Sequence, residues 1–275
     1  MIFQRLVWAA LAVAIVIGTL QSGVQRWQVT PLILAAEMYE HQKVLAVALL
    51  DTTAIHVHAE SHSGKKHELS ADKEWEPANG IERLGWTWVA NILYAFSMSL
   101  MVFVAMCVYV YKRAGVLVQS RLAGLVAAAG WLSFHLWPPL GLHAELPGAD
   151  AGPLHDRQMW WALAACSSIA SCVVAGFVVG SWRWLVATAL LVLPFLVGAP
   201  QLQGDRLAGF GPEAHAALEQ LEQQFIWATT WVSLSFWVSM GVIAGFVFQR
   251  WLHPALMATL EGHGPTSAIV KKAYA

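Results

Sequence analysis

The sequence predicts an all-α fold, a polytopic integral membrane helical bundle, and three observations lead to this prediction. Of the 275 residues, 57% are hydrophobic and only 12% are charged, whereas soluble domains are about 45–50% apolar and about 25% charged. The apolar residues gather in runs long enough to cross a hydrocarbon core of about 30 Å. None of these runs has Asp, Glu, Lys or Arg at its centre. This composition argues against a soluble cytoplasmic enzyme and against a disordered chain.

About six transmembrane helices are expected in one membrane-embedded domain over residues 1–252, followed by a short cytoplasmic tail over 253–275. The spans cover about 5–36, 86–111, 120–142, 158–179, 182–200 and 225–250. In the first span, Pro31 is expected to kink the helix and to free backbone carbonyls that can line a cavity. The fifth span is short, contains Pro194 and follows the fourth directly, so a re-entrant segment is the alternative there.

The basic residues of the short connections predict the orientation in the membrane. With six spans, eight Lys and Arg fall on one side, namely Arg5, Lys112, Arg113, Arg121, Arg183, Arg250, Lys271 and Lys272. The positive-inside rule makes that side cytoplasmic, so we expect both termini in the cytoplasm and the chain in the inner (cytoplasmic) membrane. The opposite side receives a long connection over 37–85, two shorter ones and eight of the 11 histidines.

The long outer loop over 37–85 is rich in histidine and acidic residues. His58 and His62 are four residues apart and would share one face of a helix, whereas His56 and His58 would share one face of a strand. Either way at least two imidazoles converge, and imidazole suits divalent ions such as those of Zn, Ni, Cu and Co. These three histidines are therefore predicted to capture a transition-metal ion, with a solvated loop of incidental histidines as the alternative.

A second group of candidate metal ligands stands at the end of the first span. Glu37, Glu40 and His41 would share a helix face at positions i, i+3 and i+4. Three metal-capable side chains beside a membrane boundary would form an entry site for a cation. The alternative is a solvated helix end.

A third group surrounds the end of the third span, where Pro138-Pro139 breaks the helix. His135 is expected inside the span, and an ionisable residue within a membrane segment is a functional candidate by default. His143 and Glu145 follow it closely and complete a candidate ligand set. For His135 alone, the alternative is an interfacial side chain bonded to a carbonyl oxygen. Asn91 in the second span needs a polar partner and could face the same interior.

Signals for other activities are absent from the sequence. It contains no GxxxxGK[ST], HExxH, GxSxG or CxxC motif, so the chain is not expected to be an enzyme. Its net charge of −1 gives no case for nucleic-acid binding. A haem-binding membrane redox protein would need two axial ligands facing each other across helices, but only His135 falls within a predicted span.

Several sequence runs occur in an order that matches a known family. They are Val29-Thr-Pro31-Leu-Ile-Leu-Ala-Ala-Glu37-Met-Tyr39-Glu40 at the end of the first span, Trp75-Glu-Pro77-Ala-Asn-Gly80-Ile-Glu82-Arg83 before the second, Gly141-Leu-His-Ala-Glu145-Leu-Pro147-Gly148 after the third, Arg157-Gln158-Met-Trp160-Trp161 at the start of the fourth, and Leu193-Pro194-Phe-Leu-Val-Gly198-Ala199-Pro200 at the end of the fifth. On these runs the sequence resembles the CbtA family of cobalt transporter subunits over most of residues 1–250.

The resemblance implies a membrane subunit for the uptake of a divalent transition-metal ion, cobalt in the first place, in support of cobalamin synthesis. It also implies two partners, namely the lipid bilayer and a small one-span, histidine-bearing subunit, CbtB. Co²⁺, or Ni²⁺ as the alternative, would be the transported ion, and no permanently bound cofactor is expected. A scaffold or assembly subunit of a metal-handling complex, with no transport of its own, is the competing interpretation.

Overall fold

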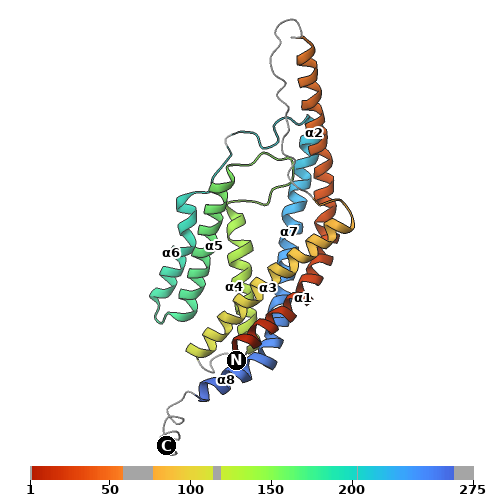
Figure 1. Ribbon diagram of the computed structural model, residues 1–275. Coiled ribbons are helices and arrows are strands. Elements are labelled where there is room, and N and C mark those ends of the chain that lie inside the picture. Colours follow the sequence, from red (N-terminus) through yellow and green to blue (C-terminus); the bar gives the residue numbers. More distant parts are fainter. Residues whose placement is uncertain (1, 58–76, 114–118, 203, 263–275) are drawn as a thin grey trace, which may run out of the picture.

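The computed structural model describes residues 2–57, 77–113, 119–202 and 204–262, and within these ranges every regular element is a helix (Figure 1). The elements are α1 (Ile2–Gln28), α2 (Thr30–Val57), α3 (Ile81–Lys112), α4 (Gln119–Trp131), the π-turn η1 (Leu132–Leu136), the short 3₁₀ helix η2 (Pro138–Leu140), α5 (Leu154–Phe177), α6 (Trp182–Val197), α7 (Pro212–Val247), the π-turn η3 (Phe248–Leu252) and α8 (His253–Gly262). The predicted all-α class is confirmed.

Four helical stretches in the described part of the chain are long and apolar enough to cross a membrane. They are Ile2–Gln28, Ile81–Lys112, Leu154–Phe177 and Pro212–Thr259, the last of which runs through α7 and η3 into α8. These stretches correspond to the first, second, fourth and sixth predicted spans. The chain is therefore a multi-pass membrane protein.

The third and fifth predicted spans are represented by shorter helices. α4 has 13 residues and passes directly into the π-turn η1, after which Pro138 and Pro139 end the regular helix because proline has no N–H to donate. α6 has 16 residues and contains Pro194. Prolines therefore end the regular helix after η1, whereas α6 continues past Pro194 and ends before Gly198, which has a φ of 85°.

The hairpin of α5 and α6 lies at one side of the bundle (Figure 1). Two tryptophans hold α6 in place through their indole N–H groups. Trp137, just after η1, donates to the Leu191 carbonyl at 2.9 Å, and Trp160 on α5 donates to the Pro194 carbonyl at 3.1 Å. These bonds satisfy backbone acceptors of α6 that face the protein rather than water.

The segment after Glu37 differs from the expected outer loop over 37–85. α2 begins at Thr30 with Pro31 in its first turn, where the missing proline N–H breaks no helical hydrogen bond. The helix then continues to Val57, because the alanines and leucines that follow Lys43 favour helix. The expected loop therefore begins with a helix, and the bend expected at Pro31 is the junction between α1 and α2.

The two ends of the bundle carry different elements. The start of α1 and helix α8 lie at one end, whereas α2 lies at the other, where it projects beyond the connections that precede α5 and α7 (Figure 1). Between these ends large apolar side chains face outward, and Leu185, Leu196 and Phe246 are 75%, 78% and 69% exposed. Faces of this kind fit the hydrocarbon of a bilayer.

Small residues allow the helices of the bundle to approach closely. A Cβ added at Gly245 of α7 would lie 2.8 Å from the Cβ of Ala123 on α4. A Cβ added at Gly18 of α1 would lie 2.7 Å from the backbone Cα of Ile92 on α3. Since backbone cannot swing aside as a side chain can, the contact at Gly18 sets the distance between α1 and α3.

The substitution Gly18→Ala is expected to destabilise the bundle by about 1–3 kcal/mol, the range typical of an overpacked core. The midpoint of thermal unfolding of the purified protein in detergent measures this effect. Gly23→Ala on the same helix is the matched control, because a Cβ there meets no heavy atom within 4 Å. Equal midpoints for the two variants would contradict the close approach of α1 to α3.

Candidate functional site

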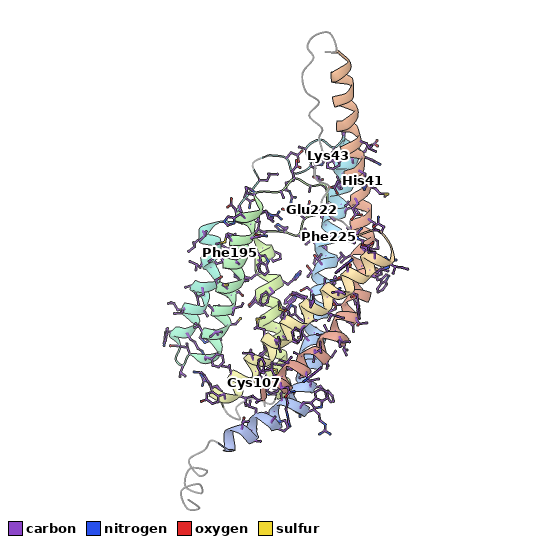
Figure 2. The ribbon with its side chains drawn as sticks, in the orientation of Figure 1. His41, Lys43, Cys107, Phe195, Glu222 and Phe225 are labelled. Atoms are coloured by element: carbon purple, nitrogen blue, oxygen red, sulfur yellow. The ribbon has the colours of Figure 1, made fainter. Side chains whose placement is uncertain are left out.

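The end of the bundle at which α2 meets the start of α7 forms a cap. Its apolar centre consists of Ala36, Leu146, Leu207 and Leu218, which come from α2, the connection before α5, the connection before α7 and α7 itself. Figure 2 labels Lys43, Glu222 and Phe225 at this end of the molecule. The cap thus joins four segments that are far apart in the sequence.

Ion pairs surround this apolar centre. Lys43 on α2 lies 3.6 Å from Asp150 and 4.8 Å from the ring centre of Phe210. Arg206 lies 2.7 Å from Glu222 on α7, and its carbonyl accepts the backbone N–H of Asp150 at 2.8 Å. The two connections are therefore fixed to each other and to both helices.

Further carboxylates of the cap surround His215 on α7. Its two ring nitrogens lie 3.5 Å from carboxylate oxygens of Asp205 and Glu219. The backbone N–H of Leu207 donates to Asp205 at 3.0 Å and, with a smaller contribution from His215, holds the pKa of this carboxyl below its ordinary value. Asp205 is accordingly anionic at neutral pH, and this part of the cap can attract cations.

Two of the predicted carboxylate ligands are held by arginines. Glu37 on α2 accepts two hydrogen bonds from Arg83 on α3, with N–O distances of 2.6 and 3.1 Å. Glu145 forms an ion pair with Arg157 at the start of α5. Two-point arginine–carboxylate contacts are among the stronger charge-assisted bonds. A metal ion would have to displace a guanidinium group to reach either carboxylate.

The other predicted ligands of the cap are not gathered around one point. Glu40 packs against the connection before α5, where a Cβ added at Gly148 would lie 3.1 Å from its Cβ. His41 and His143 are exposed, and His56 lies in the last turn of α2. Within the described residues no group of three or more His, Cys, Asp or Glu side chains is placed to hold a metal ion. His58 and His62 lie outside the described residues.

A polar pocket of about 250 Å³ lies among α1, α3, η1 and α7. Its polar lining residues are Gln21, Gln25, Asn91, Tyr94, His135, Thr229 and Ser233, and its apolar ones are Val29, Phe134, Val232 and Phe236. None of these lining residues is Asp, Glu, Lys or Arg. The structure thus places one imidazole in a pocket of uncharged polar and apolar side chains, which reaches the surface of the bundle at Tyr94, 44% exposed.

Hydrogen bonds between helices build the walls of this pocket. The Nδ2 of Asn91 on α3 donates to Gln25 at 2.9 Å and to Ser22 at 3.0 Å, both on α1. The Nε2 of Gln21 on α1 donates to the Val232 carbonyl on α7 at 2.9 Å. Gln21 and Asn91 are only 4% and 9% exposed, so their polar groups depend on these partners.

His135 reaches the pocket because of a change in helix type. It lies in the π-turn η1, which the backbone N–H of Trp137 closes on the Leu132 carbonyl at 2.8 Å. Ser133, in the same turn, contacts Ser168 on α5 at 3.1 Å. π-turns are rare and occur frequently at functional sites. Asn91 thus lines the same pocket as His135, as expected. The glutamines and hydroxyl groups that also line it were not predicted from the sequence.

The sequence offered only a weak signal for these additional residues. Gln21 and Gln25 are four residues apart and therefore share one face of α1. They stand where the first apolar run ends, so they resemble a polar helix boundary rather than the wall of a cavity. Thr229 and Ser233 have the same spacing on α7, and small hydroxyl residues are common on helices of all kinds.

The Glu37–Arg83 ion pair is expected to stabilise the junction of α2 and α3 by up to about 1 kcal/mol, since both side chains are partly exposed. A double-mutant cycle with Glu37→Gln and Arg83→Gln, followed by thermal unfolding, measures the coupling. The Lys43–Asp150 pair is the control, because its 3.6 Å distance and 56% exposed Asp150 side chain predict a coupling near zero. Additive effects of the two substitutions at Glu37 and Arg83 would contradict the structural role of this pair.

No curated protein and no solved structure matches the chain. A family model described as "Probable cobalt transporter subunit (CbtA)" matches residues 3–249, which is most of the chain. The chain belongs to the CbtA family of cobalt transporter subunits.

Proposed function

We propose that this chain is the membrane subunit through which a divalent transition-metal ion enters the cell, Co²⁺ in the first place and Ni²⁺ as a second substrate. The uptake would support cobalamin synthesis, and the chain would act in transport rather than as an enzyme. The observation that carries the proposal is the position of His135, an imidazole in a polar pocket inside an apolar bundle of a CbtA-family chain. Imidazole is a suitable ligand for both ions.

The proposed orientation places the cap outside the cell and both termini in the cytoplasm, with the chain in the inner (cytoplasmic) membrane. Lys112 and Arg113 at the end of α3, Arg183 at the start of α6, and Arg250 in η3 support this orientation. These elements end or begin at the end of the bundle opposite the cap (Figure 1). Basic residues accumulate on the cytoplasmic side of membrane proteins.

The proposed route begins at the cap and leads to His135. Glu40, His41 and His143, with the histidines at positions 56, 58 and 62, would collect the ion. Glu37 and Glu145 would lie beside the route and remain bound to their arginines, which balance their charge. Inward movement of a divalent ion gains about 4.6 kcal/mol per 100 mV of membrane potential, twice the value for a single charge.

A partner subunit belongs to the same proposal. The family description names a transporter subunit, and the described residues offer no group of three ligands for the ion. We therefore expect a second chain to supply further ligands. A small one-span, histidine-bearing protein of the CbtB type is the proposed partner.

Uptake of radiolabelled cobalt by cells that express the chain, with and without such a partner, tests the proposed function. We expect expression of both to raise the initial rate, and His135→Ala to lower it by about 10-fold or more, a loss typical of a disturbed metal site. His155→Ala is the control, because this exposed histidine at the start of α5 does not line the pocket. A rate that expression leaves unchanged in every combination would refute the proposal.

Acidification is expected to slow cobalt uptake. A histidine binds metal only in its neutral form, and free imidazole gains a proton as the pH falls from 7 to about 5.5. The initial rate in reconstituted vesicles, with the membrane potential clamped, should therefore fall over this interval. An equal rate at both pH values would argue against capture of the ion by the exposed histidines of the cap.

A further inference from the structure

The polar pocket around His135 has a composition that limits how it can hold a cation. Its polar walls consist of side-chain amides, hydroxyl groups and one imidazole, and no acidic side chain is among its lining residues. A divalent ion stripped of water would therefore bring two positive charges into a partly apolar pocket without any countercharge. Such a transfer is strongly unfavourable, so the ion must keep part of its hydration shell.

The volume of the pocket agrees with a hydrated ion. About 250 Å³ is room for several water molecules. An ion with five waters and one protein ligand fits within this space. A naked ion in contact with protein atoms alone would leave most of it unfilled.

The walls are suited to bind water rather than metal. Gln25 accepts a hydrogen bond from Asn91, and Gln21 donates to a carbonyl of α7, so these amides are fixed in position by contacts with their neighbours. Thr229 donates to carbonyls of its own helix at 2.9 and 3.0 Å, which leaves its oxygen lone pairs to accept from a water. Bridging waters satisfy such groups almost as well as direct hydrogen bonds.

His135 is the one lining side chain whose chemistry distinguishes among divalent ions. Its nitrogen favours Co²⁺ and Ni²⁺ over hard ions. Mg²⁺ requires oxygen ligands and loses its waters reluctantly. Exchange of one water for the imidazole nitrogen therefore stabilises a transition-metal ion in this pocket, but not Mg²⁺.

We propose that the pocket around His135 is a selectivity site, which takes a partly hydrated divalent transition-metal ion through a single imidazole nitrogen. This inference rests on the proposed uptake function and adds to it the form in which the ion is bound. The cap attracts cations by charge, whereas the pocket chooses among them by ligand type. The amides and hydroxyl groups of α1, α3 and α7 hold the remaining waters of the ion.

The test exchanges the imidazole for an oxygen ligand. The full chain, with its partner subunit where transport requires one, is reconstituted in vesicles, and the initial rates of Co²⁺ and Mg²⁺ uptake are compared. We expect His135→Asp to gain Mg²⁺ uptake and to lower the Co²⁺/Mg²⁺ rate ratio by at least about 10-fold, the scale of effect seen at disturbed metal sites. A gain of Mg²⁺ uptake cannot result from misfolding. His155→Asp is the matched control and should leave the ratio unchanged.

Each result separates the inference from the function on which it rests. Cobalt uptake by the wild type with an unchanged ratio in His135→Asp would overturn the selectivity site and leave the uptake function standing. Absence of cobalt uptake by the wild type in every combination would overturn both.

The visible spectrum of bound Co²⁺ tests the hydration of the ion. Weak bands of six-coordinate cobalt are expected, and intense bands of tetrahedral cobalt would exclude a hydrated ion.

Discussion

Inside a bilayer every polar group must find a partner within the protein, because the surrounding hydrocarbon offers none. The helices of this chain depend on that constraint. The side chain of Gln21 reaches the Val232 carbonyl, and Asn91 bonds to Ser22 and Gln25, so α1 is tied to both α3 and α7. The groups that hold the helices together are also those that line the pocket, and the stability of the bundle cannot be separated from the shape of its interior.

The charged side chains that attract cations and the proposed selectivity site lie in different parts of the molecule. Charged side chains gather in the cap, where pairs such as Glu37–Arg83 and Glu222–Arg206 connect different segments. The pocket below is lined by neutral polar groups, apolar side chains and an imidazole, with no acidic or basic residue other than that histidine. A carboxylate that is paired with arginine stabilises the fold. The histidines and unpaired carboxylates nearby can still bind cations, so the cap continues to attract them. A carboxylate in the pocket, by contrast, would accept hard ions such as Mg²⁺ as well as Co²⁺ and would lose this selectivity.

The fold class and the family could be predicted from the sequence, because long uncharged apolar runs and ordered motifs are local properties. The helix at the start of the expected outer loop was missed. The acidic and histidine residues after Glu37 resemble a solvated connection, but the backbone continues there as α2. The pairing of Glu145 with Arg157 and the presence of His135 and Gln25 in one pocket were also missed. Both depend on which helices become neighbours and on the π-turn, and neither is visible in residue spacing.

The short length of α6 has a consequence for the lipid. Sixteen residues span about 24 Å at a rise of 1.5 Å per residue, which is less than the hydrocarbon thickness of about 30 Å. A crossing of the membrane by α6 would therefore leave a hydrophobic mismatch on the side of the bundle where α6 lies (Figure 1). The bilayer there would have to thin, or headgroups and water would have to enter beside the helix end. Lipids with short chains would then collect along α6.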